Sequence, residues 1–106
     1  MLNYKPYIPK TVVEVVELLT LIFYKSPTFR DSFFIHRNVD TVFSQLNEGL
    51  KNIREKVGEG RYTQLTSLSD QARVHFEADA EDSNGRAREG RKLVREMQAI
   101  LGDKIE

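Results

Sequence analysis

The sequence contains no cysteine. This absence excludes a disulfide framework, a thiol nucleophile and a metal site built on thiolates, and it fits a reducing compartment. The chain also lacks an excess of charge of either sign, because 16 Lys and Arg residues balance 16 Asp and Glu residues. A general nucleic-acid binder needs surplus positive charge to displace counterions, so this balance argues against that class of partner.

Long apolar runs are missing as well. The most apolar stretch covers residues 12–24, and Glu14 and Glu17 interrupt it. It is too short and too charged for a membrane span. Lys5 and Lys10 precede the stretch, as in a signal peptide, but no small-x-small cleavage site follows it. We therefore expect a mature cytoplasmic protein that has no membrane partner.

Recognisable catalytic motifs are absent too. No glycine-rich loop opens a helix for a phosphate, and no zinc-protease motif occurs. The two histidines, His36 and His75, are far apart in the sequence, and we interpret His36 as a core residue. His75 and Asp79 are four residues apart on a predicted helix, but two ligands without a third make a weak metal site. We expect no catalysis, no cofactor and no metal.

The sequence does carry a strong helical periodicity in its middle. Its apolar positions are Val39, Val42, Phe43, Leu46, Leu50, Ile53 and Val57. Without Val42, the five steps between the remaining positions are four, three, four, three and four residues, which keeps one stripe of a helix facing its partner. This pattern predicts a helix over residues 28–57 around which the rest of the chain folds.

Local signals place the ends of this helix and of the first one. Thr11 and Glu14 have the spacing of a capping box, which predicts a helix over residues 11–25. Ser26 suits an N-cap and Pro27 suits the first position of the following helix. The Gly58-Glu59-Gly60 run is a helix stop, because glycine adopts the left-handed cap without a Cβ penalty.

Two further helices complete the predicted fold. Leu65, Leu68, Ala72 and Phe76 form an apolar stripe that predicts a helix over residues 63–80. A turn signal over residues 83–85 separates it from a helix over residues 86–101, which has one apolar and one basic face. Since a chain of 106 residues makes one domain with one core, we predict an all-α, single-domain bundle of about four antiparallel helices, with an extended arm over residues 1–10.

The predicted core lies between the first two helices. It contains Phe33, Val39, Phe43, Leu46, Leu50 and Ile53 together with Val16, Leu19 and Phe23. The rest of the circumference of helix 11–25 is unusually apolar, so this helix is either central or meets another chain along one flank. The basic face of helix 86–101 carries Arg88, Arg91, Lys92 and Arg95. No aromatic platform accompanies it in the sequence, so we interpret it as a solvated charged face.

An acidic cluster ends helix 63–80. Its carboxylates are those of Glu77, Asp79, Glu81 and Asp82, and the dipole of the helix disfavours negative charge at this end. They can pair with the basic face of helix 86–101, or they can meet a basic active site on another protein. The two interpretations are compatible. For the second one, these four residues and the apolar Val74 are our partner-binding candidates.

One part of the pattern resembles a protein family. The run Pro27-x-Phe29, a long amphipathic helix and the series Leu65-x-x-Leu68-x-x-x-Ala72-x-x-x-Phe76-Glu77-Ala78-Asp79 are similar to small bacterial immunity proteins. These protect cells against type VI secretion effectors, notably NAD(P)-degrading toxins. The resemblance covers residues 18–90, and neither the prolines of the arm nor the arginine-rich last helix belongs to the pattern.

This resemblance implies an all-helical fold, no enzymatic activity, no cofactor and a toxin as cognate partner. The immunity protein binds the toxin, an NAD(P)-degrading or other nucleotide-using enzyme, and occludes its active site. Glu77 and Asp79 are the positions to which the family's contact role transfers.

Two other classes of function remain open. A homodimeric helical adaptor or secretion chaperone would use the apolar flank of helix 11–25. A small regulator would touch nucleic acid through the basic face of helix 86–101, although the zero net charge makes nucleic acid an unfavourable partner. The size of the purified protein separates a self-associating adaptor from a monomeric inhibitor.

Overall fold

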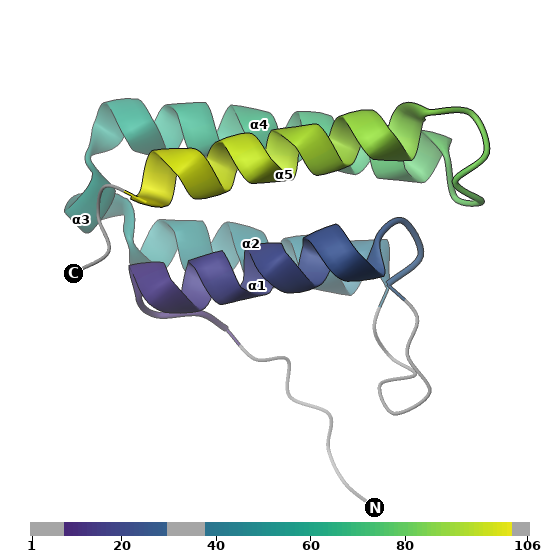
Figure 1. The fold of residues 1–106 in the computed structure, drawn as a ribbon. Helices are drawn as coiled ribbons and strands as arrows, with labels where there is room; N and C mark the ends of the chain where they lie inside the picture. The colour runs from purple at the N-terminus through teal and green to yellow at the C-terminus, as the bar shows by residue number, and fades with distance from the viewer. Residues whose placement is uncertain (1–7, 30–37, 103–106) are drawn as a thin grey trace, which may run out of the picture.

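The described part of the chain, residues 8–29 and 38–102 of a computed structural model, contains five helices and no strand. The helices are α1 (Val12–Lys25), α2 (Val39–Asn52), α3 (Arg54–Val57), α4 (Glu59–Ala78) and α5 (Arg86–Gly102). The predicted all-α fold is confirmed. Consecutive long helices run in opposite directions (Figure 1). Helix α1 packs against α2 and α5, and α4 packs against the same two helices, so each long helix has two neighbours.

The boundaries of α1 match the prediction, but the residues after it do not. The Thr11 hydroxyl accepts a hydrogen bond from the Glu14 N–H at 3.1 Å, and the Glu14 carboxylate accepts one from the Lys10 N–H at 2.7 Å. Ser26 is the C-cap of α1 and donates its hydroxyl to the Phe23 carbonyl. The prediction that Ser26 starts the next helix is therefore wrong, because its side chain bonds backward into α1.

The predicted helix over residues 28–57 begins later and is interrupted. Residues 28 and 29 are not helical, and α2 starts at residue 39 because Asn38 and Thr41 each bind the other's backbone N–H at 2.9 Å. Phe33 and His36 lie outside the described residues. Ile53 has φ −104° and ψ 7° and separates α2 from α3. The apolar positions from 42 to 57 are nevertheless all buried, so the predicted stripe does face the core.

Helix α4 starts four residues before its predicted position. Gly58 alone separates α3 from α4, with φ +91°, and residues 59 and 60 already belong to α4. The Arg54 guanidinium holds the Glu59 carboxylate, with Nη2 to Oε2 at 2.8 Å, and lies 4.6 Å from the centre of the Tyr62 ring. The predicted three-residue stop is thus a joint of one residue, because the glycine conformation suffices to end one helix and start the next.

Three phenylalanine rings meet at the centre of the core. Phe76 lies edge-on to Phe29, with ring centres 5.6 Å apart, and Phe43 is 6.1–6.2 Å from both. All three side chains are at most 1% exposed. A Cβ atom on Gly90 would lie only 2.7 Å from Cε1 of Phe76, so the glycine lets α5 approach α4 closely. Phe29 has φ +62°, a strained conformation for a large residue that is sustained by the burial of its ring.

The end of the N-terminal arm is attached to α2. Pro9 is buried against Gly49, where a Cβ atom would lie 3.0 Å from the proline ring. The Asn52 side-chain amide donates to the Pro9 carbonyl at 2.8 Å. Residues 8–10 are non-helical, as the predicted arm requires, and residues 1–7 lie outside the described residues.

The core around α1 differs in detail from the predicted one. Leu19 is buried as expected, and Leu18, which is not among the predicted core residues, is buried as well. Val16, Phe23 and Val39 only border the core and are half-buried. The reason is that α1 packs against both α2 and α5, which widens its buried arc toward Leu18 and leaves Phe23 at the edge beside α5. Among the described helices, none combines the length and apolarity needed to cross a membrane.

Replacing Leu46 with alanine tests whether the apolar stripe of α2 is buried. Leu46 is fully buried, and its loss leaves a cavity, so the free energy of unfolding should fall by about 2–5 kcal/mol. Urea unfolding followed by circular dichroism measures the change. Val74→Ala, at a site 53% exposed, is the matched control and should change stability by less than about 0.5 kcal/mol. A loss for Leu46→Ala as small as that of the control would contradict the buried position.

Gly90→Ala tests the close contact between α4 and α5. The added methyl group meets three atoms of the Phe76 ring at 2.7–3.0 Å, so we expect a destabilisation of about 1–3 kcal/mol. Gly60→Ala is the control, because a Cβ there meets nothing within 4 Å, and it should stabilise by about 0.4–1 kcal/mol. Equal effects of the two substitutions in thermal unfolding would show that the helices have room to separate.

Candidate partner-binding site

The predicted acidic cluster covers the last residues of α4 and the connection to α5 (Figure 1). We call residues 77–85 the acidic turn. Its organising group is Asp79. One carboxylate oxygen of Asp79 accepts the N–H groups of Ser83 at 2.7 Å and Asn84 at 3.2 Å. The other oxygen accepts the N–H of Ala87 at 2.9 Å. A single side chain therefore fixes the path of the turn and caps the first turn of α5.

Asp79 was a partner-binding candidate, and the structure corrects its assignment. The residue is 2% exposed, so a partner has almost no access to its carboxylate. The expected conflict with the dipole of α4 also disappears, because the carboxylate lies at the N-terminus of α5, where negative charge is favourable. The hydrogen bond from Ala87 holds the pKa of Asp79 below its ordinary value. The N–H groups of Ser83 and Asn84 act in the same direction, while burial opposes them.

The other four candidates are at the surface. Val74 is 53% exposed, and Glu81 is exposed on the acidic turn. Glu77 pairs with Arg73 at 3.3 Å and Asp82 pairs with Arg91 at 3.1 Å, and both carboxylate side chains are 46% exposed. Exposed pairs of this kind contribute about 0–1 kcal/mol each, so a partner with stronger cations can compete for the carboxylates.

One interpretation of the acidic cluster was that its carboxylates pair with the basic face of α5. This pairing is found for Asp82. Glu77 pairs instead along its own helix, and its partner Arg73 also contacts Asp40 of α2. Glu81 is exposed on the acidic turn.

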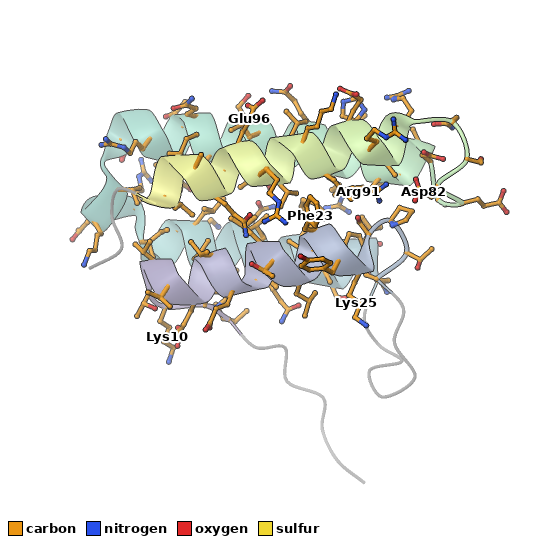
Figure 2. All side chains as sticks on the ribbon, viewed as in Figure 1. Lys10, Phe23, Lys25, Asp82, Arg91 and Glu96 are labelled. Atoms are coloured by element: carbon orange, nitrogen blue, oxygen red, sulfur yellow. The ribbon has the colours of Figure 1, made fainter. Side chains whose placement is uncertain are left out.

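Arg91 joins the acidic turn to α1. Its guanidinium donates to both carboxylate oxygens of Asp82 at 3.1 and 3.2 Å and to the Ser26 hydroxyl at 3.2 Å. Figure 2 shows Arg91 directed toward Asp82 at this end of the bundle. The turn is further shaped by Gly85, at φ +87°, and by Asn84, whose amide donates to the Ala78 carbonyl at 3.2 Å. The sequence allowed a pair between the acidic cluster and the basic face that includes Arg91, but the contact with Ser26 was not predicted.

The histidine of α4 has a structural partner. Nδ1 of His75 accepts a hydrogen bond from Nε of Arg86 at 3.0 Å, and the Asp79 carboxylate is bound to backbone N–H groups. The pair His75 and Asp79 is therefore not assembled into a common site. Within the two described stretches, no cluster of three or more potential metal-ligating His, Asp or Glu side chains is present.

The basic face of α5 has an aromatic neighbour after all. The Arg95 guanidinium lies 3.8 Å from the centre of the Phe23 ring, and Phe23 lies edge-on to Tyr24 with ring centres 5.2 Å apart. Tyr24 is 71% exposed. Arg88, Lys92 and Arg95 are exposed, as expected for a solvated face. The expectation that no aromatic side chain accompanies the face is wrong at Arg95, because the ring comes from α1, some 70 residues earlier in the sequence.

Comparisons with protein-family models, with curated proteins and with solved structures find no match for this chain. Its function is therefore inferred from its own residues.

Asp79→Asn tests the anchor of the acidic turn. The folded pKa of Asp79 is lowered, so its contribution to stability is complete above the ordinary aspartate pKa of about 3.9 and is lost as pH falls through the folded value. The variant lacks the charge and presents an amide to the Ala87 N–H. We expect lower stability at neutral pH and a shallower loss of stability on acidification below about pH 5.

Urea unfolding over a series of pH values provides the measurement. Asp70→Asn, the same change at an exposed position of α4, should leave the profile close to that of the parent protein. A parental profile for Asp79→Asn would refute the anchoring role.

Proposed function

We propose that this protein is a bacterial immunity protein without a reaction of its own, which binds a toxin effector and blocks its active site with the acidic turn. The proposal is based on the different positions of the carboxylates in the acidic turn. Asp79 is buried and holds the backbone, while Glu77, Glu81 and Asp82 stay at the surface. A loop that is already held in shape loses little conformational entropy on binding, which favours affinity.

The charge of the acidic turn fits a particular kind of target. Enzymes that act on dinucleotides or other phosphates need positive potential in their clefts. The three exposed carboxylates can occupy such a cleft in place of the phosphates of the substrate. Complementary charge also accelerates encounter and selects the partner.

Apolar area beside the charges would supply the rest of the affinity, because charge alone contributes more to association rate than to complex lifetime. Val74 lies one helical turn before Glu77 and is 53% exposed, and Ala78 and Ala80 are exposed within or next to the turn. Leu21 of α1, by contrast, is half-buried and packs against the core.

The resemblance to immunity proteins supports the same class of function with one revision. It transfers a contact role to Glu77 and Asp79, and in this chain Asp79 can act only by shaping the turn. The direct contacts are then made by Glu77, Glu81 and Asp82. The toxin would be an NAD(P)-degrading enzyme or another enzyme that uses nucleotides.

Charge reversal in the acidic turn tests the proposal. The double substitution Glu77→Lys and Glu81→Lys should weaken binding to the toxin at least tenfold, mainly by slowing association, and should abolish protection during toxin co-expression. The toxin would be sought among proteins that co-purify with the chain from its native bacterium. Surface plasmon resonance with the purified toxin then gives the two rate constants.

The matched control is Glu55→Lys in α3, at the opposite end of the bundle from the acidic turn. It has the same chemistry and should protect like the parent protein, and circular dichroism checks that each variant is folded. Full protection by the folded double variant would place the toxin contact on another surface.

A further inference from the structure

At the edge between α1 and α5, the positively charged side chain of Arg95 contacts two neutral side chains. Arg95 stacks on Phe23 at 3.8 Å and donates from Nη1 to the Gln98 side chain at 2.8 Å. Neither partner is a carboxylate, so these contacts orient the guanidinium without neutralising it. Tyr24 and Val13, on the outer side of α1, are 71% and 45% exposed and add apolar surface.

The register of α5 shows that other residues share this edge. Residues 88, 91, 95 and 98 are spaced three, four and three apart and form one stripe of the helix. Gln98 donates to the Val16 carbonyl at 3.3 Å and to the Thr20 hydroxyl at 2.9 Å, and Arg91 reaches Ser26, so the stripe lies along α1. Arg88, at the start of the stripe, is exposed. We call Val13, Tyr24, Arg88 and Arg95 the basic edge.

We propose that the basic edge docks the acidic turn of a second copy of this chain. Both halves of the complementary surface are present on one molecule, whose net charge is zero. Glu81, at the surface of the acidic turn, carries the charge opposite to that of Arg88 and Arg95. A nucleic acid fits this edge less well, because its long run of phosphates would also pass the carboxylates of the adjoining turn.

The position of the two surfaces favours a closed pair over an open chain of molecules. The Arg91–Asp82 ion pair connects them directly, with Asp82 in the acidic turn and Arg95 one helical turn beyond Arg91. When two such surfaces lie side by side, a two-fold axis brings the turn of each copy onto the basic edge of the other. The contact is made twice, so charge reversal at one position affects both halves of the interface.

The association is expected to depend strongly on salt, because its main components are exposed charges. It covers the acidic turn and would therefore compete with a toxin. The inference is nonetheless separate from the proposed function, since it is measured on the isolated protein and can fail or succeed whichever partner the turn binds.

Sedimentation equilibrium of the purified chain is the test. At about 0.01 M salt the Debye length is about 30 Å, and we expect a dimer. At about 1 M salt the Debye length falls to about 3 Å, and we expect a monomer. Arg95→Glu and Glu81→Arg should each weaken dimerisation at low salt at least tenfold. An equimolar mixture of the two variants should dimerise again, because each copy then offers the charge that the other lacks.

Arg61→Glu, on the exposed surface of α4, is the control for charge reversal away from the basic edge and should leave dimerisation unchanged. Circular dichroism confirms that each variant is folded. A monomer at both salt concentrations would overturn the proposal, as would a mixture that stays monomeric or a series of larger species. Binding of poly-glutamate or of a single-stranded oligonucleotide by a chain that remains monomeric would assign the basic edge to an anionic partner instead.

Discussion

The contact between the Phe76 ring and the backbone of Gly90 determines how the second half of this protein is arranged. A side chain on residue 90 would overlap the ring, so only glycine lets α5 lie this close to α4. The same ring touches Phe29, from the segment after α1, and Phe43 of α2. One side chain is thus shared by most of the segments that form the core.

This arrangement couples the core to the surface over a very short distance. Asp79 follows Phe76 by less than one helical turn, so a shift of the ring would move the carboxylate that caps α5. The cap in turn positions Ser83 and Asn84, and Arg91 holds Asp82 against the C-terminus of α1. The exposed carboxylates of the turn therefore have defined positions, although each of their ion pairs contributes little free energy.

Much of the fold could be predicted from apolar spacing. The stripes of α1, α2, α4 and α5 predicted the right number of long helices, because burial on one side leaves a period of 3.6 residues in the sequence. The same spacing hid two features. Ile53 and Val57 continue the apolar stripe across the break after α2, so periodicity cannot show the break. The Asn38–Thr41 capping box, which starts α2, is a weaker signal in the sequence than the Ser26-Pro27 pair.

The candidate site was harder to predict, since charge alone does not tell a structural carboxylate from an exposed one. Asp79 and Glu81 look equivalent in the sequence. Their difference arises from the backbone N–H groups that the turn directs at Asp79, and this depends on the conformations of Asp82 and Gly85, both with positive φ. The stacking of Arg95 on Phe23 joins residues about 70 positions apart, which no local pattern reveals.

The up-and-down course of the four long helices has a practical consequence for handling the protein. Helix α1 begins and α5 finishes at the end of the bundle that carries α3, opposite the acidic turn (Figure 1). A fluorescent label, a purification tag or a surface tether joined to the chain at the C-terminal end of α5 would start from that far end. Immobilised in this way, the molecule would present the acidic turn outward into solution, without a redesign of the chain.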